Sequence, residues 1–396
     1  MTKNVVFFGC RGYSNGYGGW ETLVQNLINH SNAYDTNFYV FEVVNSKKDE
    51  GIFKVNNVTC IRVYVSTNSH FQMIIYDYKC FKKLKSISKK FNFEKAVLYI
   101  MGARIGMLMA LYKNRLKKFG YILVHNPAGL EWKRESNPII KKYVYYSHKF
   151  LAKSCDYLCC DCYEMQRVYE KMCPSLIGKI SFIYYGASDY SIYKNDNLTP
   201  KSIEYFNKYR ITPYNYYLII NRFVSENSYE LILREFVNSS TDARLVIISN
   251  INYENKLYKK LAKRIPFEKD NRIVFAGTLY DKDVLADLRR FARGYINGHT
   301  LGGTNPGLLE ALASTDVNIV RDCSFSREGA GDCPIYFDET KDSFCNAIAM
   351  VDAMSCEDRK HFGIIAKERV NKMFLWEKIA KEYDALFAKI IESKEK

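Results

Sequence analysis

Short apolar runs alternate with longer amphipathic stretches along most of the chain. Residues 5–8 form the first apolar run. A glycine-bearing loop follows, and then a stretch with Leu23, Leu27 and Ile28 at helical spacing. Strand, loop and helix in this order are typical of the first segment of a doubly wound α/β domain. Because the loop does not read G-x-G-x-x-G, it disfavours a dinucleotide site.

The same alternation continues to residue 186. Further strands are predicted at residues 38–41, 60–64, 96–100, 121–124, 157–160 and 180–186, with helices at 71–91 and 141–154. We therefore expect residues 1–190 to form one domain built on a parallel sheet.

A polar stretch containing Thr199-Pro200 and Thr212-Pro213 then interrupts the pattern, and it predicts a linker at residues 191–213. A second series follows in residues 214–375. It has strands at 216–220, 244–249, 272–275, 294–297, 316–320 and 335–337, separated by helical stretches. The predicted fold class is α/β, with two Rossmann-like doubly wound domains facing a cleft.

Composition is consistent with two packed domains. The chain has 396 residues, of which 47% are hydrophobic, and domains average ~150 residues. Its N-terminus lacks the layout of a signal peptide. The longest apolar stretch, residues 97–112, contains Arg104 and is shorter than the ~20 residues a spanning helix needs. We expect a cytoplasmic protein, soluble or peripheral to the membrane.

Twelve cysteines are scattered along the chain. Cys159 and Cys162 form a C-x-x-C pair, but no second pair follows at the spacing typical of zinc sites. We therefore expect reduced core thiols and no metal.

The formal net charge of +15 is concentrated in runs such as residues 79–95 and 141–150, the second of which is interleaved with aromatic residues. Such runs can be solvated helix faces, or they can bind nucleic acid or an anionic membrane. No nucleic-acid motif accompanies them, so several runs in the first half favour the membrane surface over nucleic acid.

Residues 298–312 carry the main candidate chemistry. Gly302 and Gly303 allow a ligand to approach the backbone, and Asn305-Pro306 predicts a capped helix start. A helix N-terminus favours anions such as phosphate. Glu310, one turn further on, could accept hydrogen bonds from hydroxyl groups, and the combination suggests a nucleotide-sugar. An ordinary glycine-rich turn before a capped core helix is the alternative.

Polar residues also follow other predicted strands. Arg222 ends a buried-type strand, and its guanidinium can bind a diphosphate as a fork, although a surface ion pair is the alternative. Residues 125–134 follow another strand at the edge where open α/β sheets bind ligands.

These stretches resemble motifs of bacterial rhamnosyltransferases of glycosyltransferase family 4. The matching residues are Arg11-Gly12, Tyr17-Gly18-Gly19-Trp20-Glu21-Thr22, Asn126-Pro127-Ala128-Gly129-Leu130-Glu131-Trp132-Lys133-Arg134, Arg222-Phe223-Val224-Ser225-Glu226-Asn227 and residues 298–311. They occur in order over nearly the whole chain.

The resemblance implies a GT-B fold and a retaining, metal-independent glycosyltransferase, a hexosyltransferase of capsule or cell-wall polysaccharide synthesis. The second domain would bind the donor, dTDP-L-rhamnose, and no other cofactor is expected. The first domain would bind a lipid-linked acceptor, a saccharide on undecaprenyl diphosphate, at the cytoplasmic face of the inner membrane. Helix 376–396 would pack back on the first domain.

The resemblance also implies residue roles. Donor-binding residues would be Gly18, Gly19, Arg222, Asn227, His299, Gly303, Thr304, Asn305 and Glu310. Acceptor-binding residues would be Arg11, Tyr17, Trp20, Glu21, Asn126, Trp132 and Arg134. Catalytic candidates are Arg222, Glu310, His125 and Glu131; the last two could take the acceptor proton. His125 could instead be a core histidine, and Glu131 could pair with Lys133 or Arg134.

Three positions depart from the family pattern. Gly302 stands where the wider family has a glutamate, Asn227 replaces a lysine, and Ala128 replaces the aspartate of Asn-Pro-Asp-Gly in close relatives. One alternative is a UDP-hexose-dependent transferase of the same fold. Ala128 motivates another, a non-catalytic sugar-nucleotide-binding partner of an active transferase.

Overall fold

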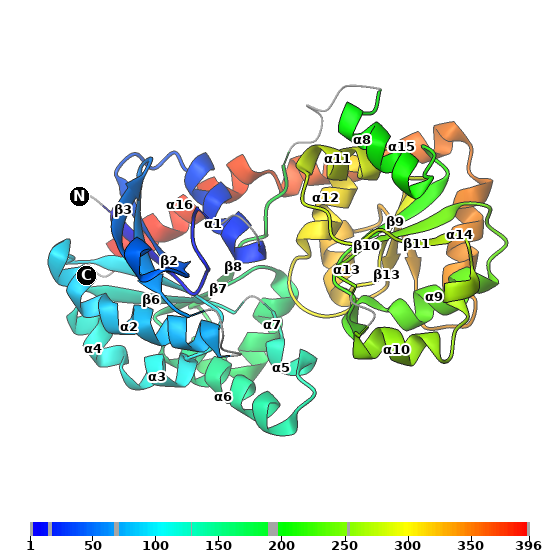
Figure 1. The fold of residues 1–396 in the computed structure, drawn as a ribbon. Coiled ribbons are helices and arrows are strands. Elements are labelled where there is room, and N and C mark those ends of the chain that lie inside the picture. Colours follow the sequence, from blue (N-terminus) through cyan, green and yellow to red (C-terminus); the bar gives the residue numbers. More distant parts are fainter. Residues whose placement is uncertain are drawn as a thin grey trace. The chain divides into compact units, whose positions relative to one another are not determined.

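The computed structural model describes residues 3–14, 18–66, 71–127, 129–188, 197–251 and 254–393. The chain divides into two compact units (Figure 1). Unit 1 consists of Met1–Gly186 together with Trp376–Lys396, and unit 2 is Ala187–Leu375.

The described part of unit 1 forms an eight-stranded sheet in the order β3-β4-β2-β1-β5-β6-β7-β8, parallel except for the β3–β4 pair. Its strands are β1 (Lys3–Phe8), β2 (Thr36–Val44), β3 (Gly51–Val55), β4 (Val58–Tyr64), β5 (Ala96–Met101), β6 (Tyr121–Asn126), β7 (Tyr157–Cys160) and β8 (Ile180–Phe182). Its helices are α1 (Gly19–His30), α2 (Gln72–Lys90), α3 (Gly106–Leu111), α4 (Lys113–Lys118), α5 (Glu131–Arg134), α6 (Pro138–Ser154), α7 (Tyr163–Met172) and α16 (Trp376–Glu392).

The central strands explain the continuous apolar runs of the sequence. Every residue of β5 and β6 is buried, because helices cover both faces of a parallel sheet. Figure 1 shows α1 and α16 over one face of this sheet and α2, α3 and α6 toward the other. The chain passes from β1 to β2 on one side and later places β5 on the other side of β1. The β1–β5 edge is therefore the topological switch point of unit 1.

The last helix, α16, completes the core of unit 1. The Phe387 ring packs against the rings of Phe7, Tyr99 and Tyr383, with centroids 6.4, 5.7 and 5.9 Å apart. The hydroxyl of Tyr99 donates to the hydroxyl of Tyr383 at 3.0 Å. All four side chains are buried, so one face of the β1–β5 sheet depends on residues from the end of the chain.

The described part of unit 2 forms a six-stranded parallel sheet in the order β11-β10-β9-β12-β13-β14. Its strands are β9 (Tyr216–Ile220), β10 (Arg244–Ile248), β11 (Ile273–Phe275), β12 (Gly294–Asn297), β13 (Asn318–Arg321) and β14 (Ile335–Phe337). Its helices are α8 (Pro200–Tyr209), α9 (Tyr229–Asn238), α10 (Lys256–Ala262), α11 (Lys282–Arg290), α12 (Pro306–Ser314), α13 (Ser324–Ala330), α14 (Ser343–Ala353) and α15 (Cys356–Met373).

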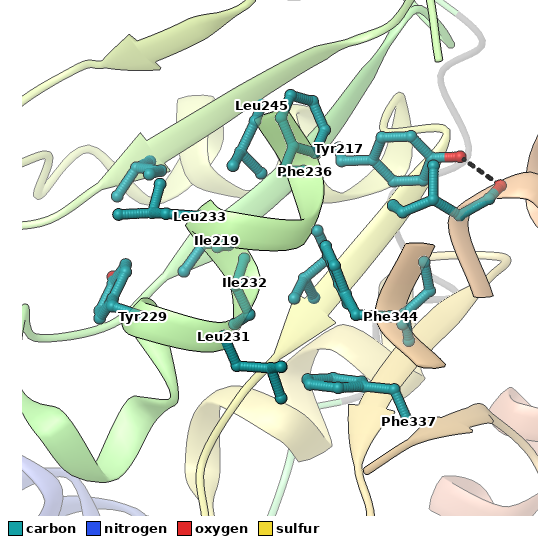
Figure 2. Close-up of a cluster of buried hydrophobic side chains, with 14 of the residues drawn as sticks. Tyr217, Ile219, Tyr229, Leu231, Ile232, Leu233, Phe236, Leu245, Phe337 and Phe344 are labelled. Atoms are coloured by element: carbon teal, nitrogen blue, oxygen red, sulfur yellow. Dashed lines mark hydrogen bonds between the residues drawn. The ribbon is translucent and has the colours of Figure 1, made fainter. Parts of the chain in front are cut away.

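The core of unit 2 gathers side chains from β9, α9, β14 and α14. Figure 2 shows α9 lying across the strands, with Ile232 and Phe236 directed into a cluster that includes Tyr217 and Phe344. The buried hydroxyl of Tyr217 lies 2.7 Å from a carboxylate oxygen of Asp352. This core fixes β9, the strand that precedes Arg222.

The structure differs from the predicted elements in several places. The short helices α3, α4 and α5 had not been predicted, and the last strand of unit 1, expected at residues 180–186, spans only Ile180–Phe182. Strand β3 had not been predicted, because it contains no buried apolar run: Ile52 and Val55 are half-buried and Phe53 is exposed.

Residues 200–209, within the expected linker, form α8. Thr199 caps this helix, and the hydroxyl of Ser202 donates to Asp287 of α11 at 2.6 Å. Two X-Pro pairs in a polar stretch indicated a linker, but Pro200 occupies the first helical position, where proline is tolerated.

All twelve cysteines are free, and Cys159 and Cys162 are buried. Burial raises the pKa of Cys159 to about 12, so that this thiol is protonated at neutral pH. In the part of the chain that the structure describes, no helix has the length and apolar content required to cross a bilayer.

Replacing Phe387 by alanine tests the dependence of unit 1 on α16. The substitution removes a buried ring that contacts three others, and it should lower the free energy of unfolding by about 3–5 kcal/mol. Urea denaturation monitored by circular dichroism measures the change. Tyr34→Ala is the matched control, since Tyr34 is 98% exposed, and it should change stability by less than about 0.5 kcal/mol. Equal effects of the two variants would contradict the packing described here.

Candidate functional site

The switch point of unit 2 lies between β9 and β12. These strands pair in parallel through Tyr217 and Gly294, although β10 and β11 lie between them in sequence. Arg222 follows the carboxyl end of β9, and residues 298–305 follow the carboxyl end of β12. The two loops therefore emerge side by side at the position where open α/β sheets bind ligands.

Hydrogen bonds hold these two loops together. The amide of Thr300 donates to the carbonyl of Glu226 at 2.9 Å, and the hydroxyl of Ser228 donates to the carbonyl of Gly298 at 2.7 Å. At Gly298 a Cβ would lie only 2.2 Å from the carbonyl oxygen of Asn227. Only glycine fits there, so this position fixes the distance between the loops.

Asn227 and His299 add a side-chain bridge between the loops. The Asn227 amide group donates through Nδ2 to the carbonyl of Arg222 at 2.7 Å. Its Oδ1 lies 2.9 Å from Nδ1 of His299 and accepts from it when that nitrogen carries the proton. Asn227 is buried. Its side chain thus links the two loops of the candidate site. The resemblance instead implies a direct contact between Asn227 and the donor.

Helix α12 begins at this edge. Asn305 caps it by accepting from the amide of Leu308 at 3.2 Å, and Pro306 occupies the first helical position. Gly302 has φ 110°, a conformation that favours glycine, and Gly303 and Thr304 are half-buried. The first turn therefore presents backbone amides and the positive end of the helix dipole. The backbone amides of the first turn are consistent with an anion site. The later residues of α12 are core residues, which is also consistent with an ordinary capped core helix.

Arg222 is available to a ligand. Its side chain is 68% exposed, and its Nη2 lies 3.8 Å from Oε1 of Glu226. An exposed ion pair at this distance contributes little to stability. The guanidinium can therefore exchange this partner for an anionic group at low cost.

Glu310 has a partner that the sequence did not reveal. Its Oε2 accepts from Nη2 of Arg289 at 2.5 Å, and the Arg289 side chain is 6% exposed while that of Glu310 is 36% exposed. Arg289 belongs to α11, an amphipathic helix without any pattern that marks a site residue. The pair fixes the direction of the Glu310 carboxylate.

The switch point of unit 1 is shaped by glycines and Trp20. Gly9 and Gly102 follow β1 and β5 with φ 105° and 72°. A Cβ at Gly102 would lie 2.6 Å from the ring of Trp20, and one at Gly9 would lie 2.3 Å from the carbonyl oxygen of Met101. Trp20 therefore packs over the ends of both strands.

Two carboxylates hold the loop between β1 and α1. Oε1 of Glu21 accepts from the amide of Arg11 at 2.6 Å, and a Cβ at Gly18 would lie 2.0 Å from its Oε2. Gly19 accepts from the hydroxyl of Tyr185 at 3.0 Å. Glu21 is buried and Arg11 is exposed. Glu21 thus contacts the loop backbone, and the structure leaves Arg11 as the accessible group. Tyr17 lies outside the described residues.

Glu42 is the second of these carboxylates, and sequence reasoning missed it. Its Oε1 accepts from the amides of Tyr13 and Ser14 at 3.0 and 2.7 Å, and its Oε2 accepts from Arg62 at 3.0 Å. Burial raises the pKa of Glu42, but the hydrogen bonds to Ser14 and Arg62 outweigh it, so that the pKa lies below its usual value.

Two residues at the end of β6 point into the fold. His125 is fully buried, its Nδ1 lies 3.2 Å from the carbonyl of Ile100, and burial together with His148 lowers its pKa to about 3. The side chain of Asn126 donates to the hydroxyl of Tyr99 at 2.8 Å. This placement favours the core-histidine alternative for His125 and a structural contact for Asn126. Ala128 lies outside the described residues.

Glu131, His148 and Tyr169 form a chain of hydrogen bonds, and Glu131 is the member that reaches solvent. Its Oε2 lies 3.2 Å from Nε2 of His148, whose Nδ1 lies 2.9 Å from the hydroxyl of Tyr169. The Glu131 side chain is 41% exposed, whereas His148 is fully buried. Burial raises the pKa of Glu131, but the hydrogen bond and charge of His148 outweigh it and lower the pKa below its usual value.

Trp132 and Arg134 complete this region. Trp132 is buried, and its ring packs edge-on against that of His148 with centroids 5.2 Å apart. Arg134 is exposed. The main partner of Glu131 is thus His148, in place of the Lys133 or Arg134 considered from the sequence. The spacing of 17 residues between Glu131 and His148 gave no signal.

The comparisons with known proteins show the fold. Residues 2–188 match a family described as a domain of unknown function, DUF1972. Among curated proteins no sequence matches significantly.

Solved structures are similar over nearly the whole chain. Sucrose-phosphate synthase from Thermosynechococcus elongatus has a TM-score of 0.76 at 14% identity, covering 99% of this chain and 100% of that one. HepE from Anabaena, in complex with UDP, has a TM-score of 0.71 at 10% identity, covering 98% of this chain and 100% of that one. The E. coli trehalose-6-phosphate protein bound with UDP-2-fluoro glucose has a TM-score of 0.68 at 12% identity, covering 97% of this chain and 98% of that one. The predicted fold class is thus confirmed: the chain has the GT-B fold, with two Rossmann-like units.

Glu42→Gln tests the buried carboxylate beneath the loop of residues 10–14. The substitution should lower the free energy of unfolding at pH 7 by about 1–3 kcal/mol, because it removes charge-assisted hydrogen bonds. A pKa that folding lowers stabilises the fold above the unfolded value, ~4.3, and this contribution is lost as the pH falls through the folded value.

The difference between Glu42→Gln and the wild type should therefore shrink below about pH 4, as measured by urea denaturation across pH. Glu94→Gln, at an exposed position, is the control. A difference that stayed constant with pH would rule out the ionised role of Glu42.

Proposed function

We propose that this chain is a retaining glycosyltransferase that moves a deoxyhexose, L-rhamnose, from dTDP-L-rhamnose to a lipid-linked glycan acceptor in surface polysaccharide synthesis. The observation that carries the proposal is the convergence at the β9–β12 edge of Arg222, the first turn of α12 and the Glu310–Arg289 pair. These groups suit the diphosphate and the hydroxyl groups of a nucleotide-sugar.

Catalysis in this proposal rests on stabilising the leaving group. The bond between the anomeric carbon and the diphosphate oxygen breaks, and the acceptor oxygen bonds to the same face of the sugar. Negative charge then develops on the nucleoside diphosphate. Arg222 and the amides of Gly303, Thr304 and Asn305 supply positive charge where it develops. The mechanism proposed here therefore uses no metal ion.

In this proposal the Glu310 carboxylate accepts a hydrogen bond from a hydroxyl group on the ribose-type sugar of the nucleotide. Arg289 would hold one of its oxygens and thereby direct the other toward the ligand. His299 would contribute by fixing the loop through Asn227.

Unit 1 would receive the acceptor. Glu131 is the better candidate for taking the acceptor proton, because its carboxylate reaches solvent while His125 is fully buried. The exposed Arg11 and Arg134 suit the diphosphate of a lipid-linked saccharide. Trp20 and Trp132 would support these residues through packing.

A UDP-hexose donor is the second candidate. Two of the similar structures contain UDP or UDP-2-fluoro glucose, and the same groups of unit 2 suit any nucleoside diphosphate. Groups that bind the diphosphate cannot distinguish the two donors. Contacts to the sugar and to the base would have to do so.

Arg222→Ala tests the diphosphate contact. One charge-assisted hydrogen bond contributes ~1.5–3 kcal/mol, so kcat/KM for the donor should fall about ten- to a hundred-fold. Release of nucleoside diphosphate in the presence of membrane lipid extract measures turnover. Arg264→Ala is the matched control, because Arg264 is 61% exposed and also lies 3.7 Å from a glutamate. Equal activity of the two variants would refute the role of Arg222.

A donor panel separates the candidate functions. With dTDP-L-rhamnose, UDP-glucose and UDP-galactose offered in parallel, we expect turnover of dTDP-L-rhamnose. Turnover of a UDP-sugar alone would replace the rhamnose assignment with the second candidate. Donor binding measured by calorimetry, without transfer to any acceptor in the extract, would favour the non-catalytic binding partner.

A further inference from the structure

Helices α3 and α6 of unit 1 pack side by side and leave an apolar surface exposed. Its members are the side chains that line the outer side of both helices, which we call the α3–α6 face: Met107, Leu111, Ile139, Tyr143, Tyr146 and Phe150. Their exposed fractions range from 37% for Met107 to 81% for Leu111. Single exposed apolar side chains are common, but a contiguous apolar patch marks an interaction site.

The α6 members follow a helical repeat. Positions 139, 143, 146 and 150 are spaced by four, three and four residues, which places them in one stripe along the helix. The opposite side of α6 carries the core residues Leu151 and Ala152 together with His148. Helix α6 therefore has a second apolar stripe in addition to the one that packs against the sheet.

A groove runs along this stripe. It has a volume of about 420 Å³ and is lined by Met107, Ile139, Lys142, Tyr143, Tyr146 and Phe150. The hydroxyl of Tyr143 donates to the carbonyl of Arg104 at 2.8 Å, so that at least one wall of the groove is fixed to the backbone.

Most of the charge around the face is positive. Glu135 and Asp156 lie just beyond the two ends of α6, and Asp156 pairs with Lys117 of α4 at 2.7 Å. The α4 and α6 segments contain eight lysines and arginines and no aspartate or glutamate. Lys142 lies at the groove, and Lys149 and Lys153 follow it on the same side of α6 at helical spacing. The guanidinium of Arg115 lies 5.3 Å from the ring of Tyr112, at the end of α3. Lysine and arginine side chains of this kind cover apolar surface with their stems and present the charge beyond it.

We propose that the α3–α6 face docks on an anionic phospholipid bilayer, with the apolar stripe at the level of the acyl chains and the lysines among the headgroup phosphates. Charge complementarity selects this occupant, since each basic residue near an anionic leaflet is attracted to it. A second copy of the chain would bring two strongly positive faces together. Single-stranded nucleic acid could stack on the rings of Tyr143, Tyr146 and Phe150. It is disfavoured because Ile139, Leu111 and Met107, the aliphatic half of the face, offer no ring on which a base can stack and suit acyl chains better.

This inference deepens the proposed function, because a lipid-linked acceptor would be met at the same surface. It does not depend on the transferase activity, since docking requires neither donor nor acceptor. Vesicle binding and glycosyl transfer can therefore fail independently.

The test is flotation of the full chain with vesicles of phosphatidylcholine, with or without about one third phosphatidylglycerol. We expect binding to the anionic vesicles and little to the neutral ones. The double variant Ile139→Ser/Phe150→Ser should weaken binding at least about ten-fold. Lys142→Glu/Lys153→Glu should weaken it by more than about five-fold per lysine, which corresponds to ~1 kcal/mol for each basic residue.

Matched controls lie in unit 2. Ile364 on α15 is 55% exposed and Lys360 is also exposed, so Ile364→Ser and Lys360→Glu make the same chemical changes elsewhere and should bind as the wild type does. Circular dichroism confirms that each variant is folded.

Three results would overturn the proposal. One is equal vesicle binding by the α3–α6 variants and the controls. Another is self-association in sedimentation equilibrium that the same variants abolish. The third is tighter binding to single-stranded RNA than to anionic vesicles.

Discussion

The contact between Gly298 and the carbonyl of Asn227 is the constraint on which the candidate site of unit 2 depends. It allows the loops after β9 and β12 to meet, and the hydrogen bonds of Thr300 and Ser228 then hold them there. Without that close approach, neighbouring strands would still place Arg222 and α12 at one edge of the sheet. Their separation, however, would vary, and a diphosphate needs its positive groups at fixed positions.

In unit 1, buried carboxylates hold the loops at the sheet edge in place. Glu42 and Glu21 accept backbone amides of the loop after β1, and Asp77 pairs with Arg104 beyond β5, with Nε of the arginine 2.7 Å from the carboxylate. These charges are used to shape loops and are not presented to solvent. Glu131 differs, because one end of its hydrogen-bonded chain is buried at Tyr169 and the other reaches the surface. A carboxylate anchored in this way keeps a fixed direction.

The sequence predicted the two sheets and the loops at the two edges that carry the candidate sites, because apolar strands of parallel sheets and the loops after them are local patterns. It did not predict Arg289, His148 or Glu42, since each acts through a partner distant in sequence and occupies an ordinary helix or strand. Burial also could not be read from the motifs. Asn126, Glu21 and Asn227 belong to matching stretches, yet their side chains are buried against the protein itself. The helix within the expected linker was missed because proline marks both a turn and a first helical turn.

The place of α16 has a consequence for biosynthesis. Phe7 and Tyr99 bury their rings against Phe387 and Tyr383, which a ribosome adds only after all of unit 2. The first unit to emerge is therefore the last that can be completed. Its sheet must wait with one aromatic face uncovered while unit 2, which is continuous in sequence, can fold as it is made. During that interval the nascent chain exposes the surface that chaperones recognise, and a premature stop near residue 376 would damage the unit encoded by the 5′ half of the message.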